Sequence, residues 1–403
     1  MSAQNPFHES ARLTAVQTPV IPIVSQWMAE TPGTISLGQG MVAYGPPDAA
    51  MLAARTFPLS ADEHRYGRVE GLPELVDMVE AKLAAENNIR VRPHSRTVIT
   101  AGSNLGFMNA VLAIADPGDE FIFPLPYYFN HDMAVTMANC KTVGVKTLPD
   151  YQLDLDAITR AITPRTRAVV TCSPNNPTGA VYSEASLRAV NALCRDRGVF
   201  HIHDEAYEYF TYDNQVNFSA GSIEGAAGHT ISLYSLSKGY GMASWRIGFM
   251  VIPESLWPAV NKIQDTLLIC TPQIAQRVAV AAMQVGSSYP RAHAARIGAL
   301  RPRVHAALTD PSVPCETADV HGAFYHFVRV HTSMTSMTLA ERLIREHKVA
   351  VIPGEAFGVS DVCAMRVSFG ALDEATVDEG LGRLTEGLKD LCEGQRAEGR
   401  GQK

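Results

Sequence analysis

The sequence predicts an α/β fold: a large three-layer α/β/α domain with a mostly parallel sheet, and a smaller α/β domain built from the N- and C-terminal segments. Through the middle of the chain, short runs rich in β-branched and aromatic residues alternate with helix-like stretches. This alternation is typical of parallel sheets covered on both faces. From about residue 290 the pattern changes. With 403 residues, 46% of them apolar, the chain is long enough for two cores.

Seven strand-like runs define the expected sheet, and turn residues bound most of them. The runs cover residues 97–100, 121–123, 142–145, 168–172, 200–203, 230–234 and 247–252. Ligands of such sheets gather beyond the carboxyl ends of the strands. The residues directly after each run are therefore the first candidates for a functional site.

The remaining segments are expected to form the smaller domain and an arm. Helices are predicted over residues 291–308, 338–346 and 373–392, and strands in 321–330, KVAVIPG and MRVSFG, before a charged tail that is expected to fray. Prolines interrupt the N-terminal stretch, which cannot form a compact unit alone. The expected limits are 1–45 for an arm packing with the small domain, 46–290 for the large domain and 291–403 for the small one.

Composition excludes several classes of protein. A formal net charge of -7 without a dense Lys/Arg run argues against nucleic acid or an anionic membrane as the main partner. No stretch approaches the roughly 20 apolar residues of a membrane-spanning helix, and the opening residues lack a signal pattern. The seven cysteines are scattered without a CxxC pair. We therefore expect a cytoplasmic protein whose cysteines act as small apolar residues.

One segment, SLSKGYGMASWRIGF, surrounds a single lysine with small and hydroxylated residues at the end of an apolar run. Lys238 is poorly placed there for a solvated surface charge, but it is well placed to form an imine with an aldehyde cofactor. Ser235, Ser237 and Arg246 could then bind a phosphate, because hydroxyls and a guanidinium match its oxygens. The alternative is a loop with an exposed lysine, since short motifs give false positives.

Two other run ends carry polar residues suited to the same cofactor. Asp204 follows the run 200–203, where a carboxylate can pair with a protonated pyridine nitrogen and keep the ring an electron sink. Tyr207 can reach the phenolic oxygen of that ring, and Asn176 in SPNNPTG is a second donor to it. Each segment taken alone is as easily a simple turn.

Weaker signals come from two more segments. Gly102, Ser103 and Asn104 open a helix-like stretch after a strand, where backbone N–H groups point at an anion, although such turns are common. Tyr127 or Tyr128 could stack on a flat ring or could simply belong to the core.

His201 and His203 raise the possibility of a metal site. Strand alternation puts both imidazoles on one face, but no matching His, Asp or Glu pattern follows at other run ends. We therefore favour packed or hydrogen-bonded histidines over a metallohydrolase and predict no metal.

Together these segments resemble the class I aminotransferases, fold type I of the pyridoxal-phosphate enzymes, over nearly the whole chain. The family's motifs are a serine three residues before the lysine and an arginine eight residues after it, an asparagine–proline turn, and Asp-x-x-Tyr. The matching positions are Ser235, Lys238, Arg246, Asn176, Asp204 and Tyr207. The resemblance implies pyridoxal 5'-phosphate as cofactor, held by Lys238 as a Schiff base.

The resemblance implies further roles. Tyr66 in RYGRVEGLPEL would reach the cofactor phosphate of a neighbouring subunit, which implies a homodimer. Tyr128 would stack on the ring, Arg366 in Arg-x-Ser would bind the substrate α-carboxylate, and Gly40 would offer a backbone contact beside it. Ser244 departs from the family, which usually has glycine there. If that turn needs a positive φ, serine is costly and the place of Arg246 is in doubt.

A narrower likeness, in SLGQGMVAYGPP, PYYFNHDMA and VIPGEAFG, is to plant aminotransferases for methionine and aromatic amino acids. It implies an apolar side-chain pocket lined by Tyr44, Tyr66 and Ile23, and a ping-pong exchange in which Lys238 acts as the base. Asn176 would also contact the substrate. Three alternatives remain open: a carbon–sulfur β-lyase on the same fold, a non-catalytic cofactor-binding regulator, and the metallohydrolase based on His201 and His203. The lack of a helix-turn-helix extension counts against the regulator.

Overall fold

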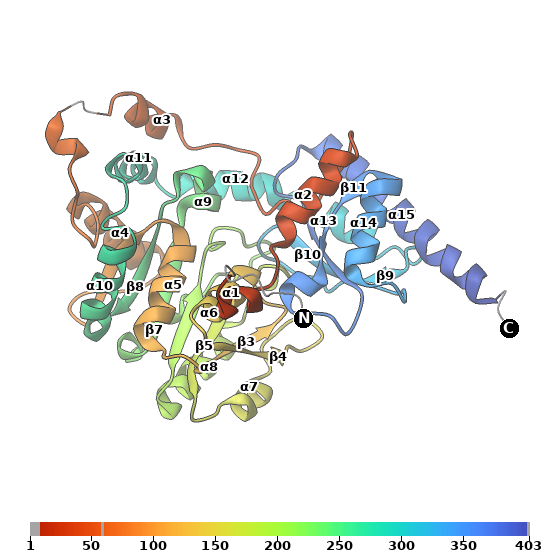
Figure 1. The fold of residues 1–403 in the computed structure, drawn as a ribbon. Coiled ribbons are helices and arrows are strands. Elements are labelled where there is room, and N and C mark those ends of the chain that lie inside the picture. Colours follow the sequence, from red (N-terminus) through yellow and green to blue (C-terminus); the bar gives the residue numbers. More distant parts are fainter. Residues whose placement is uncertain (1–8, 58–59, 401–403) are drawn as a thin grey trace, which may run out of the picture.

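The computed structural model describes residues 9–57 and 60–400, and its centre is a seven-stranded sheet (Figure 1). The strand order is β2-β8-β7-β6-β5-β3-β4, and only β8 runs antiparallel to its neighbours. The strands are β2 (Ser95–Thr100), β3 (Glu120–Leu125), β4 (Lys141–Lys146), β5 (Thr166–Cys172), β6 (Phe200–Asp204), β7 (Thr230–Ser235) and β8 (Gly248–Pro253). Each predicted run overlaps one of them, which confirms the mostly parallel sheet.

Helices cover both faces of this sheet, because alternate strand residues point to opposite sides. Phe121 and Phe123 pack in a core with α5 (Gly102–Ile114), α6 (Phe129–Met137) and α10 (Trp257–Leu267). Ile122 points the other way, into a core with α7 (Leu155–Ala161) and α8 (Glu184–Arg197). On that second face Tyr234 and Phe249 pack against α4 (Pro73–Glu86) and α11 (Gln273–Gln284). The three layers predicted from the sequence are therefore present.

A smaller α/β unit is built from both ends of the chain. Its four-stranded sheet has the order β12-β13-β10-β9. The strands are β9 (Cys315–Glu316), β10 (Tyr325–Val330), β12 (Ile352–Pro353) and β13 (Ala364–Ser368). Near it, β1 (Ile35–Ser36) pairs in parallel with β11 (Val349–Ala350), and α2 (Val20–Glu30) lies beside α14 (Ser336–His347), as Figure 1 shows. Val20 and Val24 of α2 share a core with Phe327 and Ile344.

Three details differ from the prediction. The helix expected over 291–308 is two helices, α12 (Ser288–Gly298) and α13 (Arg301–Leu308), and a proline stands in the first turn of α13, where it cannot donate a hydrogen bond to the preceding turn. KVAVIPG forms two short strands in different sheets, β11 and β12. The last helix, α15 (Glu374–Arg400), continues past residue 392 into the tail that was expected to fray. The predicted domain limits stay predictions.

Shorter elements complete the described chain. The α-helices are α1 (Ala11–Ala15), α3 (Asp48–Arg55) and α9 (Leu236–Gly239), and the 3-10 helices are η1 (Ala61–His64), η2 (Ala220–Ser222), η3 (Ala226–Gly228), η4 (Ala243–Trp245), η5 (Glu254–Leu256) and η6 (Gly354–Phe357). Within residues 9–57 and 60–400, no helix combines the length and apolar character needed to cross a bilayer. All seven cysteines are buried.

Candidate active site

A pocket lies where the carboxyl ends of β5, β6 and β7 meet the N-terminus of α5, the edge at which parallel sheets bind ligands. Ten of its twelve lining residues were predicted as site residues, and Cys172 and Ala206 are the other two. The predicted ten are Ser103, Asn104, Tyr128, Asn176, Asp204, Tyr207, Ser235, Ser237, Lys238 and Arg246. Segments more than a hundred residues apart in the sequence thus meet at one place.

Asp204 ends β6 and is buried, with a nitrogen close to each carboxyl oxygen. The Ala206 N–H donates to its Oδ1 at 3.0 Å, and Nε2 of His131 lies 3.1 Å from its Oδ2. His131 in turn stacks on Phe107, with ring centroids 4.1 Å apart. Sequence reasoning missed His131. It stands three residues after Tyr128, one turn into α6 and so on the same side of that helix, and this spacing is the signal that could have found it.

Lys238 stands in the short helix α9, which the Ser235 side chain caps by accepting the Ser237 N–H at 3.1 Å. Its Nζ donates a short hydrogen bond to the Gly40 carbonyl oxygen. Burial, and then the positive charges of Arg366 and Arg246, lower the pKa of this amine to about 8. A substantial fraction of Lys238 is therefore uncharged at mildly alkaline pH, which a nucleophile or base requires.

Gly102, at the first position of α5, makes room for Arg246. Its φ is +78°, and a Cβ there would lie 2.4 Å from Nη2 of Arg246 and 3.0 Å from its Cζ. The guanidinium therefore lies directly over the start of a helix whose N–H groups point into the pocket. With the Ser235 and Ser237 hydroxyls nearby, this end of the pocket has the donors that a phosphate needs.

Ser244 does not have the positive φ that would have placed Arg246 in doubt. It lies in η4, and the left-handed residues of this segment are Gly241 (φ 63°) and Arg246 itself (φ 51°, ψ 59°). The strain, of about 1 kcal/mol for a residue with a Cβ, falls on Arg246 rather than on the serine. Arg246 still lines the pocket, and its Nη1 donates to the Ala243 carbonyl at 2.9 Å.

Arg366 of β13 is a buried guanidinium, 2% exposed, beside the pocket. Nη1 donates to Oδ1 of Asn176 at 2.9 Å and Nη2 to the Gly38 carbonyl at 2.7 Å, whereas Nε has no hydrogen-bond partner. The rings of Tyr325 and Phe357 lie 4.6 Å and 5.2 Å from its Cζ. Within the described chain no carboxylate pairs with this cation, and a buried unpaired charge is costly. The arrangement suits an incoming carboxylate.

Gly40 connects Lys238 with Arg366. A Cβ at residue 40 would lie 3.0 Å from the Tyr325 hydroxyl and 3.5 Å from Nη2 of Arg366, so a side chain there would crowd the tyrosine hydroxyl and contact the guanidinium. The Tyr325 hydroxyl is 2.8 Å from that of Tyr207, and burial raises the pKa of Tyr207 well above its usual range. Tyr325 was also missed, because the register that places β10 beside Arg366 cannot be read from sequence.

Six predicted residues do not line the pocket: Gly40, Gly102 and Arg366, described above, and Tyr66, Tyr44 and Ile23. Tyr66 is 79% exposed. The hydroxyl of Tyr44 donates to the backbone carbonyl of Lys238 at 2.7 Å while its ring stacks on His293 with centroids 3.8 Å apart, so Tyr44 supports the lysine from behind. Ile23 is a half-buried residue of α2. Tyr128 does line the pocket, and the side-chain amide of Asn130 donates to its hydroxyl at 2.7 Å.

His201 and His203 are packed side chains of β6. Oγ1 of Thr171 lies 2.8 Å from Nε2 of His201 and 2.7 Å from Nδ1 of His203, and the Asn191 amide lies 3.1 Å from Nδ1 of His201. Burial lowers the pKa of both imidazoles. In the part of the chain that the structure describes, no group of three or more His, Cys, Asp or Glu is arranged to hold a metal.

A larger cavity, of about 400 Å³, lies between β3, β4 and the four-stranded sheet. The charges in its wall are paired with one another, Lys146 with Asp361 at 2.7 Å and Arg329 with Glu316 at 3.3 Å. The desolvated lysine and the buried carboxylate line the smaller pocket, and the unpaired guanidinium lies beside it. The smaller pocket is therefore the candidate active site.

The candidate site fits a flat, phosphorylated pyridine aldehyde. Gly102 leaves space for the guanidinium at the phosphate end, and Asp204 offers a buried carboxylate to a ring nitrogen. Lys238 lines the same pocket with a desolvated amine that can condense with an aldehyde.

Comparisons with known proteins agree with this geometry. The family model described as aminotransferase class I and II matches residues 32–384. The chain is 32% identical over 391 residues to the aromatic aminotransferase ISS1 of Arabidopsis thaliana, covering 95% of this chain and 96% of that protein. It is 30% identical over 361 residues to an aspartate aminotransferase of Pyrococcus abyssi, covering 88% and 92%.

Solved structures give the same result. The aspartate aminotransferase from Thermus thermophilus with maleate matches with a TM-score of 0.84 and 30% identity, covering 95% of this chain and all of that one. The N-succinyldiaminopimelate aminotransferase from Mycobacterium tuberculosis matches with a TM-score of 0.87 and 26% identity over 94% of this chain. The chain therefore belongs to the class I and II aminotransferases and is a pyridoxal-phosphate-dependent transaminase.

Proposed function

We propose that this aminotransferase moves the α-amino group of an apolar amino acid, methionine or an aromatic one, to a 2-oxo acid by a ping-pong exchange. The observation that carries the proposal is the placement of Lys238, Gly40 and Arg366 in one connected group, with an N–H of Arg366 left free. A single pocket of this size serves donor and acceptor in turn, so the first oxo acid must leave before the second enters.

Pyridoxal phosphate supplies an aldehyde for the amino group and a ring that withdraws electrons from the adjacent carbon. Ser235, Ser237 and Arg246, with the start of α5, would hold its phosphate. Asp204, which lies beside His131, would pair with the ring nitrogen, because burial strengthens the attraction between opposite charges. Asn176 and Tyr207 would donate hydrogen bonds to the ring oxygen of the cofactor, and Tyr128 would stack on the ring.

Lys238 would act as the base that takes the proton from Cα of the substrate and returns it to the adjacent carbon of the cofactor. Its lowered pKa, about 8, leaves part of the amine uncharged near neutral pH, where a general base is most effective. Tyr44 fixes the backbone of this lysine through the hydrogen bond to its carbonyl. The amine is therefore free to move while its main chain stays in place.

Arg366 would bind the substrate carboxylate and so orient the Cα–H bond toward Lys238. The other two cations near the pocket, Lys238 and Arg246, have roles at the cofactor, which leaves none in the described lining for a second carboxylate. Aromatic rings, Tyr325 and Phe357, surround the guanidinium. This environment favours an apolar side chain over a dicarboxylate. The relative from Arabidopsis thaliana carries the name aromatic aminotransferase, and that name supports the same choice.

We also propose a cytoplasmic homodimer in which Tyr66 reaches the phosphate of the partner's cofactor. The support is its 79% exposure in a single chain, which leaves its side chain available for contact with a partner. Tyr44 and Ile23 would then form part of the side-chain wall once the dimer closes around it.

The test is a half-reaction screen, in which the cofactor-loaded protein receives one amino acid at a time. Absorbance reports loss of the aldehyde form, and the oxo acid is identified in the same sample. We expect methionine and the aromatic amino acids to react fastest and aspartate to react slowly. Pyruvate and ammonia from a β-substituted amino acid would instead identify a β-lyase. Binding of the cofactor without reaction of any donor would indicate a regulator.

A further inference from the structure

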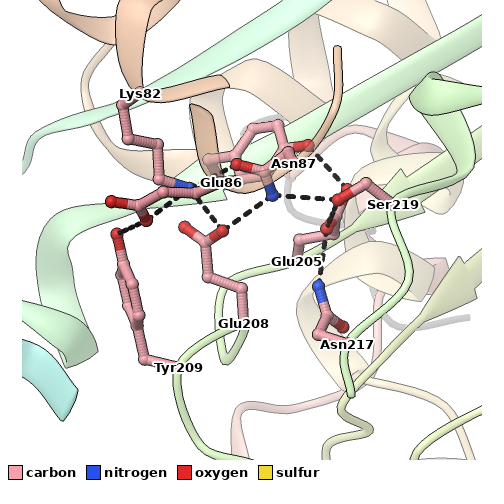
Figure 2. Close-up of polar contacts among 9 residues, drawn as sticks. Lys82, Glu86, Asn87, Glu205, Glu208, Tyr209, Asn217 and Ser219 are labelled. Atoms are coloured by element: carbon pink, nitrogen blue, oxygen red, sulfur yellow. Dashed lines mark hydrogen bonds and ion pairs between the residues drawn. The ribbon is translucent and has the colours of Figure 1, made fainter. Parts of the chain in front are cut away.

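A cluster of buried and half-buried polar side chains lies between α4 and the segment that follows β6 (Figure 2). We name it the Lys82 cluster. Its members are Lys82, Glu86, Asn87, Glu205, Glu208, Tyr209, Asn217 and Ser219. None of them lines the pocket, so the cluster has no direct contact with cofactor or substrate.

Lys82 is the centre of this cluster. Its Nζ makes a short ion pair with Glu208 Oε2, donates to Asn87 Oδ1 at 2.7 Å, and lies 4.0 Å from Glu86 Oε2. The ring centroids of Tyr209 and Tyr234 lie 5.3 Å and 5.2 Å from the same nitrogen. The side chain is only 9% exposed, so these contacts replace water around the charge.

Two carboxyl groups, those of Glu86 and Glu208, lie within ion-pair distance of this ammonium, and a third, that of Glu205, belongs to the same cluster. Glu205 is 1% exposed and receives hydrogen bonds from Ser219 at 2.6 Å, Asn217 at 2.8 Å and the Tyr234 hydroxyl at 2.7 Å. Glu208 accepts from Asn87 at 2.9 Å. In the described chain, Lys82 is the only basic group within ion-pair distance of the cluster. Arg291 of α12 faces it only through the Tyr209 ring, at 5.5 Å.

The cluster is joined to the cofactor-facing residues of β6. Glu205 directly follows Asp204, and its N–H donates to the Leu233 carbonyl at 2.8 Å. The Glu208 N–H donates to the Glu205 carbonyl at 3.0 Å, which closes a turn around Tyr207. The position of this turn therefore depends on where the carboxyl groups of Glu205 and Glu208 are held.

The cluster also contacts the lysine segment. The Tyr209 hydroxyl donates to Glu86 Oε2 at 2.9 Å, and a Cβ at Gly239 would lie 2.9 Å from the Tyr209 ring. Gly239 directly follows Lys238. Tyr234, which donates to Glu205, directly precedes Ser235. Both segments that meet at the cofactor are thus supported from behind by the same group of side chains.

We infer that Lys82 is a positioning residue: its charge holds the buried carboxylates together and thereby keeps the turn 204–209 and the segment 235–239 aligned around the cofactor. Without the ammonium, Glu208 and Glu86 would repel each other in a site with little water, and the two segments would separate. The inference rests on cofactor binding at this pocket and does not depend on which amino acid is the substrate.

The test uses variants that separate charge from shape. Lys82→Met keeps the length of the side chain and its packing between the tyrosine rings but removes the charge. Lys82→Met combined with Glu208→Gln removes the charge together with its main partner. Lys146→Met is the matched control, because Lys146 pairs with Asp361 at 2.7 Å but is 80% exposed.

Two quantities are measured for each full-length protein, at about pH 8 and about pH 6: the dissociation constant of pyridoxal phosphate, and hydrogen exchange in segments 204–209 and 235–239. Lys82→Met should weaken cofactor binding about ten-fold at the higher pH, a usual size of coupling between contacting residues. Binding should recover at the lower pH, where Glu205, whose pKa burial raises to about 7, takes up a proton and the negative charge of the cluster falls. The double variant and the control should bind within about three-fold of the wild type at both values.

Equal loss of affinity in the single and double variants would show that the charge is irrelevant. Unchanged affinity in Lys82→Met, with both segments as protected as in the wild type, would overturn the inference. Failure of Lys82→Met to fold, with protection lost throughout the sheet, would assign the cluster a general structural role instead. Activity enters none of these measurements, so an error in the proposed substrate leaves the test intact.

Discussion

Replacing Gly102 with alanine tests the phosphate end of the pocket. The added methyl would lie 2.4 Å from Nη2 of Arg246, so the guanidinium must move. Displacing it removes a charge-assisted hydrogen bond to the phosphate, worth about 1.5–3 kcal/mol, or about ten- to hundred-fold in the dissociation constant of the cofactor. The φ of +78° adds a strain of about 1–2 kcal/mol that lowers the free energy of unfolding.

Gly225 provides a matched control for that strain. Its φ is +76°, nearly the same, but nothing lies within 4 Å of a Cβ built there. Gly225→Ala should therefore lose a similar amount of stability and none of the cofactor affinity. The assays are chemical denaturation of the cofactor-free proteins and equilibrium dialysis of pyridoxal phosphate. Equal cofactor affinities in the two variants would mean that Arg246 does not hold the phosphate through this contact.

Three further predictions concern charge and assembly. Burial and the neighbouring Glu208 raise the pKa of Glu205 from 4.5 to about 7, so folding favours its protonated form. Relative to the Glu205→Gln variant, the wild type should therefore lose about 3 kcal/mol of unfolding free energy as pH rises from 4.5 to 7. Denaturation experiments in which the stabilities of the two proteins change with pH in parallel would refute this. Lysine in the Arg366→Lys variant cannot form two parallel hydrogen bonds with the substrate carboxylate, so kcat/KM should fall about 100-fold while the absorbance of the bound cofactor stays unchanged. An unaltered KM would argue against binding of the carboxylate at this residue. Hybrids of Tyr66→Ala and Lys238→Ala subunits should regain activity that neither parent has, and inactive hybrids would mean that Tyr66 acts within its own chain.

The chemistry-bearing residues that follow strands were predictable, because a strand-like run and its polar end are both local features. Lys238, Asp204 and Asn176 were each found in this way and lie together in the structure. His131 was not found, because its partner Asp204 is more than seventy residues away and the contact depends on how α6 packs. Tyr325 was missed for a similar reason, since it reaches Tyr207 only through the pairing of β10 with β13.

The sheet itself was predictable from apolar alternation, but the breaks in the smaller unit were not. KVAVIPG reads as one apolar run, and only the neighbours it meets decide that Val349 joins β1 while Ile352 joins β13. The same holds for α12 and α13. The apolar pattern over this stretch predicts one continuous helix, and the proline in the first turn of α13 was therefore not recognised as a helix boundary. The Lys82 cluster shows the same limit, since none of its residues forms a recognisable motif.

The pairing of β1 with β11 has a consequence for synthesis of the chain. The central sheet uses residues 95–253 and can assemble while the ribosome is still adding the rest. Ile35, however, must wait for Val349, and Gly38 and Gly40 reach Arg366 only when β13 has been made. A nascent or truncated chain would thus bind the coenzyme before it can bind an amino acid substrate. Catalytic activity is therefore the last property that the growing chain acquires.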